Sequence, residues 1–503
     1  MNTSPEPKNL LAQAWFMFEK TRYMRAIRLA ERAIQFSESG SETNINALFL
    51  LLKCYNRFQR LDAATETAKE LMRLGATNAD LHMELAVLAR LKQDQDEYTR
   101  QLQQALALAP ENRSLKIEHL LSKIREDHQE DATTAPETLG ELHALAGGID
   151  AINIANPENI SLLDALSARG LLDNDWKSKL DAYLQDALVE SISHARIGFL
   201  LAQQARVEDN PEVEAHYLLK ANAMLEKLEK NLGREWSLDK NNRATEQLKR
   251  LFPDASEYWA GLEGSTGLAP IVILNLPCSG AERFAKLVGH CDSVADGGEC
   301  RSLRYAVKRV ANKIFPENES DSEELGLEQI KQLEAPQLHE IAEHYIREQR
   351  HISNAPYITD ALYSNILRVG LIANLFPAAK FVHIERDCID TCLDIYRSPL
   401  TNIPYATSIS HTAQAYAVCR SRVDHWRSIY PDRFSYVSYN ELTENPDKVL
   451  ADFCSFAQIE MPEIFSREAV QNAASTEKKL ALLEELGIKN MDRIVAGANN
   501  LVS

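Results

Sequence analysis

Two short segments place groups that could bind an anion directly after buried strands. In the first, an apolar run over 271–274 leads into a tight turn at 277–280 and then into a helix that begins near Glu282. Such a turn directs free backbone amides and the positive end of the helix dipole at an anion. An ordinary strand-to-helix connection would show the same pattern. No lysine follows Gly280, so this is not a nucleotide-triphosphate loop, and ATP hydrolysis is disfavoured.

The second segment delivers an arginine to the same kind of position. A strand expected over 380–384 ends just before Arg386, and a helix expected from residue 389 follows. Ligands of open α/β sheets bind at the carboxyl edge of the strands, which is where Arg386 would lie. The same side chain could instead form a structural ion pair with Asp387 or Asp390.

The elements around these segments predict an α/β domain over 268–474. Strands interleaved with helices indicate a parallel sheet covered on both faces. A C-terminal helical tail of two polar helices is expected over 475–503. We expect strands at 271–274, 357–359, 380–384 and 434–437, and helices at 282–288, 303–314, 327–350, 366–375, 389–396 and 412–429.

The N-terminal half predicts an all-α array. Apolar residues recur at helical spacing, with small residues such as Ala26, Ala30 and Ala33 where two helices must approach closely. Units of about 34 to 37 residues with this pattern resemble tetratricopeptide repeats. A generic helical bundle is the alternative. Repeats are expected over 9–126 and, after a loop at 127–139, further repeats and a bridging helix over 140–252, with the domain boundary at 253–267.

Two longer stretches carry a resemblance to a known family. They are ITDALYSNILRVGLIANLFPAAKFVHIERD at 358–387 and RFSYVSYNELTENP at 433–446. Both are similar to the core of the sulfotransferase family, and the chain resembles bacterial proteins that join tetratricopeptide repeats to a sulfotransferase domain, a branch related to the protein-tyrosine enzymes. The resemblance implies a P-loop-like α/β domain that transfers a sulfuryl group from 3′-phosphoadenylyl sulfate to a hydroxyl of a protein or peptide presented by the repeats.

The resemblance also implies roles for particular residues. The donor's 3′-phosphate would contact Arg386 and Asp394, and Glu299 would be the catalytic base with Arg301 beside it. A solvated loop carboxylate is the alternative for Glu299. The donor's 5′-phosphosulfate would lie on the first turn, formed by Pro277, Cys278, Ser279, Gly280, Ala281 and Glu282.

The donor residues depart from the family pattern. Cys278 stands for a basic residue, Ala281 and Glu282 for a pair of hydroxyl residues, and Asp394 for a serine. A carboxylate beside a phosphate is repulsive unless one of the two is neutralised. Ala361 also replaces a basic residue, and no basic, glycine-rich loop follows Phe465; Arg283, Lys286, Arg397 or Ser398 could compensate. A second hypothesis is therefore a catalytically inactive domain that serves as a protein-binding or scaffolding module and uses no cofactor.

Composition excludes several other classes. The 503 residues carry a net charge of −18, which disfavours nucleic acid as a partner. Eight cysteines lack the paired spacing of a zinc site, and no His, Asp and Glu cluster has ligand spacing, so no metal is implied. The chain begins without a secretory signal and has no apolar run long enough to span a membrane. A cytoplasmic protein is expected.

Overall fold

The N-terminal half of the protein is a helical array. The computed structural model describes residues 6–20, 22–129, 136–147, 156–169, 171–185, 191–256, 259, 262–314, 327–462 and 476–488. The residues described before position 257 form thirteen helices: α1 (Pro7–Glu19), α2 (Tyr23–Phe36), α3 (Glu42–Arg57), α4 (Leu61–Arg73), α5 (Ala79–Leu91), α6 (Gln95–Leu108), α7 (Arg113–Gln129), α8 (Pro136–Ala146), α9 (Pro157–Ser167), α10 (Asn174–Gln185), α11 (Ile192–Val207), α12 (Pro211–Asn231) and α13 (Leu238–Leu251).

Local sequence explains where these helices begin and how they pack. Ser41, Asn78 and Asn210 each accept a hydrogen bond from a backbone amide of the first helical turn, as N-cap residues do. Consecutive helices pack in pairs, α1 on α2, α5 on α6 and α11 on α12. The predicted all-α half is confirmed, with one correction. The segment 127–139 was expected to be a loop, but α7 continues to Gln129 and α8 begins at Pro136, a residue well suited to the first helical position; residues 130–135 lie outside the described part.

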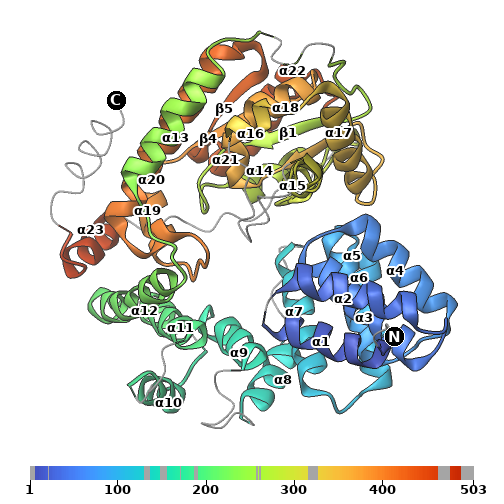
Figure 1. Ribbon diagram of the computed structural model, residues 1–503. Helices are drawn as coiled ribbons and strands as arrows, with labels where there is room; N and C mark the ends of the chain where they lie inside the picture. Colours follow the sequence, from blue (N-terminus) through green and yellow to red (C-terminus); the bar gives the residue numbers. More distant parts are fainter. Residues whose placement is uncertain are drawn as a thin grey trace.

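The array curves so that both of its ends reach the C-terminal half (Figure 1). Near its start, the Asp62 backbone amide donates a 3.0 Å hydrogen bond to Glu348 in helix α17 (Ala335–Gln349). Near its end, α13 packs against α20 (Ile409–Ile429), and the Asn222 side chain donates to the Tyr396 carbonyl at 2.9 Å. The helical half is thus joined to the other half at two separate places.

The C-terminal half contains a five-stranded parallel sheet, as predicted. Its strands are ordered β2-β3-β1-β4-β5, and each neighbouring pair is parallel. The chain leaves β1 toward β2 on one side and leaves β4 toward β5 on the other, so the switch in direction falls between β1 and β4. The crevice at the carboxyl ends of these two strands is where open α/β sheets bind ligands. The strands are β1 (Ala269–Ile273), β2 (Val294–Ala295), β3 (Tyr357–Asp360), β4 (Lys380–Glu385) and β5 (Phe434–Ser438).

Helices cover both faces of this sheet. Ile271 and Ile273 of β1 belong to a core formed with α14 and α22, whereas Val272 belongs to the opposite core, which includes α15, α17, α18 and α20. Successive strand residues point to opposite faces, so one strand contributes to both cores. The helices after the array are α14 (Ala281–Val288), α15 (Ser302–Ile314), α16 (Leu327–Lys331), α17, α18 (Val369–Leu375), α19 (Cys388–Tyr396), α20, α21 (Tyr439–Glu444), α22 (Pro446–Ala457) and α23 (Thr476–Glu485).

Two details differ from the sequence expectations, and a third expectation is met in part. The helix expected over 327–350 is two helices, because Pro336 occupies the first turn of α17 and Glu334 with Gln337 forms a capping box there. Strand β2 was missed. Of the two helices expected in the tail, α23 is present, and residues 489–503 lie outside the described part. No helix in the described ranges is long and apolar enough to cross a membrane.

Candidate functional site

The first turn is fixed against the end of β4 and against Tyr439. The Asn275 side chain donates to the Ile384 carbonyl at 3.2 Å and accepts from the Ile384 amide at 3.3 Å, which fastens the end of β1 to β4. Gly280 precedes α14 with a φ of 94°. A Cβ on Gly280 would lie 2.7 Å from the Tyr439 ring, so both the backbone conformation and the space require glycine. Residues 277–282 therefore form a closely packed turn at the sheet edge.

Arg386 lies directly on this turn. Its guanidinium donates to the Cys278 carbonyl and, at 2.6 Å, to the Asp394 carboxylate, and it stacks on the Tyr439 ring at 4.3 Å. The Arg386 side chain is only 12% exposed, against 37% for Asp394. The structure thus brings together the turn, Arg386 and Asp394. The alternative considered for Arg386, an ion pair with Asp387 or Asp390, is not formed: Asp387 accepts from the Asp390 amide as the N-cap of α19, and Asp390 pairs with Lys479.

A chain of alternating charges connects this arginine to the helical array. Asp394 also lies 3.9 Å from Arg397, and Arg397 forms a bidentate ion pair with Glu214 of α12 at 2.7 and 3.3 Å. The Arg397 and Glu214 side chains are 11% and 5% exposed. A buried charge is stable only with a partner, so Glu214 of the array holds Arg397 and leaves Asp394 to Arg386.

Two of the other groups expected to compensate for missing cations are also engaged. Lys286 pairs with Glu282 at 3.3 Å, and the Ser398 hydroxyl donates to the Asp394 carbonyl at 2.7 Å. Burial raises the pKa of the Cys278 thiol, which keeps it uncharged at neutral pH. Of the residues expected to compensate, Arg283 in the first turn of α14 is left as a source of positive charge beside the turn.

The loop that carries Glu299 is tied to the end of β3. The Gly297 amide donates to the Thr359 hydroxyl at 3.1 Å, and the Ala361 amide donates to the Gly298 carbonyl at 2.9 Å. The helical array also touches this loop, since a Cβ on Gly298 would lie 3.2 Å from the side-chain nitrogen of Gln93. The loop is thus held from both halves of the protein.

Glu299 lies within electrostatic range of the first turn. Partial burial of the carboxyl is the main cause that raises its pKa, the nearby Glu282 carboxylate raises it further, and Arg301 opposes both. A carboxyl with a raised pKa is a better proton acceptor at neutral pH than an ordinary glutamate. The arrangement could therefore remove a proton from a hydroxyl placed beside the turn. Arg301 also donates a hydrogen bond to Tyr305 on α15.

Sequence reasoning missed the buried group that anchors this loop. Asp360, at the end of β3, is fully buried and accepts hydrogen bonds from the Leu362 amide, the Cys300 amide and the Tyr345 hydroxyl. Burial raises the pKa of Asp360 to about 7. The signal was present, because an acidic residue that ends a buried strand lies at the same sheet edge as Arg386. Tyr439, which closes over both Gly280 and Arg386, was not singled out either.

Comparison with known protein families identifies the family of the C-terminal region. Residues 270–463 match the model of the sulfotransferase family. The C-terminal region is a sulfotransferase-family domain. Its matched residues include the first turn, Glu299, Asp360 and Arg386, whereas the helical array lies outside the match.

Two solved sulfotransferase structures also match parts of this chain. The sulfotransferase domain from the curacin biosynthetic pathway is 15% identical to this chain. The aligned region covers 45% of this chain and 99% of that domain, with a TM-score of 0.30. Sulfotransferase STF1 from Mycobacterium tuberculosis H37Rv is 13% identical and covers 73% of this chain and 98% of its own, with a TM-score of 0.28.

A longer curated protein matches as well. An uncharacterized protein of Aquifex aeolicus (strain VF5) is 22% identical over 285 residues, which are 56% of this chain and 36% of that protein. The chain therefore spans about a third of the length of this relative.

Proposed function

We propose that this protein is a binding module built on a sulfotransferase-family domain, in which the helical array holds a protein or peptide partner and the donor site no longer supports transfer from 3′-phosphoadenylyl sulfate. The observation that carries the proposal is the ion pair between Arg386 and Asp394, at 2.6 Å. By resemblance, Arg386 is the residue that would hold the donor's 3′-phosphate. Its charge is already neutralised by a carboxylate of the same domain.

The residues present do not fit the donor. A phosphate group that contacts Arg386 would have to displace the Asp394 carboxylate or lie a few ångströms from its negative charge. At an effective dielectric of about 20, two unit charges of like sign repel by about 4 kcal/mol at 4 Å. Neither Cys278 nor Lys286 offsets this repulsion, because Cys278 is uncharged and Lys286 pairs with Glu282.

The surface of the array supports the binding role. Most large apolar side chains that are exposed in the described residues lie on the array, among them Phe16, Phe36, Met72, Leu108 and Leu232. Curved helical arrays offer extended concave surfaces to which partners bind. We propose that the array consists of tetratricopeptide-like repeats and that its partner is a protein or peptide.

Sulfuryl transfer to a hydroxyl of a protein or peptide is the second candidate function. The position of Glu299 favours it, since this carboxyl has a raised pKa and lies within electrostatic range of Glu282 on the first turn. In this reading Glu299 accepts the proton of the acceptor hydroxyl, and Arg301 orients Glu299.

Titration with adenosine 3′,5′-bisphosphate separates the two candidates. We expect the wild-type protein to bind it no more tightly than about millimolar in calorimetry, because Asp394 repels the phosphate. Asp394→Ser should tighten binding at least about tenfold, since it frees a charge-assisted contact of about 1.5 to 3 kcal/mol. Adding Arg386→Ala to Asp394→Ser should abolish the gain.

Asp390→Ser is the matched control, because Asp390 lies on the same helix but pairs with Lys479 at 2.5 Å instead of Arg386. It should leave binding unchanged. Micromolar binding by the wild type that is lost in Arg386→Ala would overturn the proposal and support the enzyme. In that case Glu299→Gln should remove sulfuryl transfer and leave binding of the bisphosphate intact.

A further inference from the structure

A cavity of about 310 Å³ lies where the start of the helical array meets the sulfotransferase-family domain. Its array side is formed by α2, the α3–α4 connection and α4, and its domain side by α15 and α17. This volume is at the lower end of the range of small-molecule sites. The lining residues are Met24, Phe58, Gln59, Arg60, Asp62, Ala63, Ser302, Tyr305, Ala306, Lys308, Arg309, His344 and Glu348.

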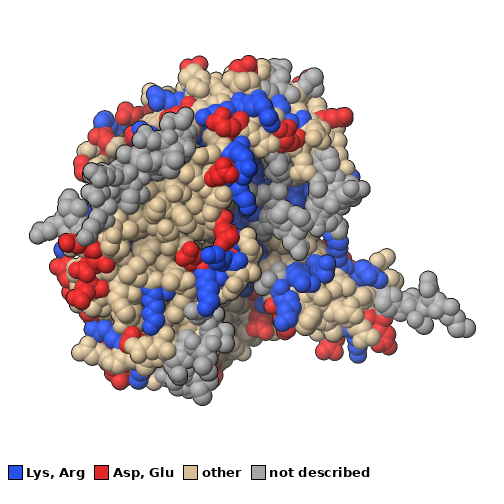
Figure 2. Space-filling view, turned by 60° about the vertical axis from the view of Figure 1, so that its left-hand side comes forward, with Lys and Arg blue, Asp and Glu red and all other residues tan. Residues whose placement is uncertain are grey.

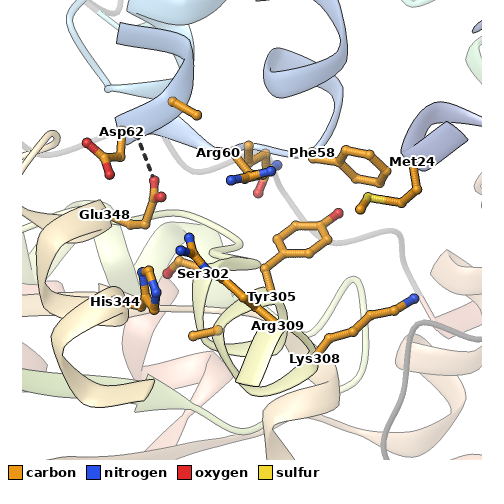
Figure 3. Close-up of a pocket in the computed structure, with 13 residues that line it drawn as sticks. Met24, Phe58, Arg60, Asp62, Ser302, Tyr305, Lys308, Arg309, His344 and Glu348 are labelled. Carbon is orange, nitrogen blue, oxygen red and sulfur yellow. Dashed lines mark hydrogen bonds between the residues drawn. The ribbon is translucent and has the colours of Figure 1, made fainter. Parts of the chain in front are cut away.

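One side of the cavity is aromatic and apolar. Phe58 packs edge-on against Tyr305 across the junction, with ring centroids 5.4 Å apart. Figure 3 shows Phe58, Met24 and Tyr305 gathered at one side and the contact between Asp62 and Glu348 at the other, with Arg60 between them. The cavity therefore offers an aromatic and apolar wall beside a positive group.

Positive charge is concentrated around this cavity, although the protein as a whole carries a net charge of −18. Arg60, Lys308 and Arg309 line it, and Arg301 and Arg304 lie close enough to Tyr305 to lower the pKa of its hydroxyl, against the larger effect of burial. On the face shown in Figure 2, in contrast, basic and acidic side chains are largely interspersed. A local cluster of cations beside aromatic rings is the arrangement that holds an organic anion.

The two carboxylates in the lining are already engaged. Asp62 pairs with Arg347 at 2.8 Å and with His351 at 3.4 Å. Glu348 accepts the hydrogen bond from the Asp62 amide, and burial raises the pKa of Glu348. In the described part of the chain, Arg60 stacks on the Tyr55 ring at 4.9 Å and forms no ion pair. The Glu348 carboxylate lies within electrostatic range of Arg60 but is not bonded to it, so a ligand anion can still contact the guanidinium.

We infer that this cavity is a binding site for a small aromatic anion, in which the ring packs against the wall formed by Met24, Phe58 and Tyr305 and a carboxylate or phosphate group contacts Arg60 and Arg309. The site is separate from the first turn and Arg386, so it does not depend on whether the donor site is active. A ligand bound there touches both halves of the protein and should strengthen the junction between them.

Calorimetry with phenyl phosphate tests this site on the full chain. We expect phenyl phosphate to bind at least about tenfold more tightly than inorganic phosphate or benzyl alcohol. Inorganic phosphate has the negative charge but no aromatic ring, and benzyl alcohol has the ring but no charge. Arg60→Gln should weaken binding of phenyl phosphate at least about tenfold, the size expected when a charge-assisted hydrogen bond is lost. Ala63→Phe should block the cavity sterically and abolish binding.

Lys313→Gln is the matched control for a lost positive charge, since Lys313 lies on the same helix as Arg309 but pairs with Glu340 at 2.6 Å. It should leave binding unchanged. Equal weakening by Lys313→Gln and Arg60→Gln would mean that only the general charge of the surface matters and would overturn the inference. Equal affinity for phenyl phosphate and inorganic phosphate, or full binding by Ala63→Phe, would overturn it as well.

Discussion

The Glu214→Ala variant is expected to lose about 3 to 5 kcal/mol of unfolding free energy, the cost of removing one partner from a buried ion pair. Arg397 keeps its charge in this variant but has lost the bidentate carboxylate, and it is only 11% exposed. Its remaining neighbour, Asp394, already pairs with Arg386. Urea denaturation followed by tryptophan fluorescence measures the loss.

Two further variants make this result specific. Glu226→Ala removes an exposed carboxylate from the same helix, α12, and should change stability by no more than about 0.5 kcal/mol. The double variant Glu214→Ala with Arg397→Met removes both charges and should be more stable than Glu214→Ala alone. If Glu214→Ala were no less stable than Glu226→Ala, the ion pair would not support the junction between α12 and the sulfotransferase-family domain.

The second large effect concerns pH and the buried Asp360. Its pKa in the folded protein is about 7, against an ordinary value of 3.8, so the folded protein holds a proton that the unfolded chain releases. The stability from the protonated carboxyl is fully present below about pH 4 and is lost as the pH rises through about 7. At about 1.4 kcal/mol for each pKa unit, the loss amounts to about 4 kcal/mol.

Comparison with Asp360→Asn isolates this contribution. The asparagine cannot ionise, so the difference in unfolding free energy between wild type and variant should shift in favour of the variant as the pH rises from 4 to 7. Unfolding curves recorded at pH 4.5, 6 and 8 measure it. Parallel pH profiles for the two proteins would show that Asp360 does not hold a proton in the folded state.

Most of the fold could be predicted from hydrophobic periodicity. The buried strands are short apolar runs bounded by helices, and the array helices carry small residues on their packing faces, so both halves were predicted correctly. Strand β2 was not predicted, because a strand of two residues has no hydrophobic pattern and is defined only by its pairing with β3. The break before α17 was predictable, since Pro336 and the capping residues Glu334 and Gln337 mark a helix start.

The candidate site was predictable in its positions more than in its contacts. That Arg386 and the first turn meet follows from the rule that ligand groups gather at the carboxyl ends of strands. The ion pair between Arg386 and Asp394 could not be derived from spacing, because Asp387 and Asp390 are nearer to Arg386 in sequence. In the structure these two residues are engaged elsewhere, Asp387 as an N-cap and Asp390 in an ion pair with Lys479. The cavity between the two halves could not be predicted from the sequence, because the residues of its two walls are about 250 positions apart in the chain.

The double attachment of the array has a mechanical consequence. Its last helix continues covalently into the sulfotransferase-family domain, and its first helices are bonded back to α17 through Asp62, which contacts Glu348 and Arg347. A partner that straightens the array must strain or break these contacts between the first helices and α17. Because the Gln93 side chain lies beside Gly298, such a change would also remove a contact from the segment that carries Glu299.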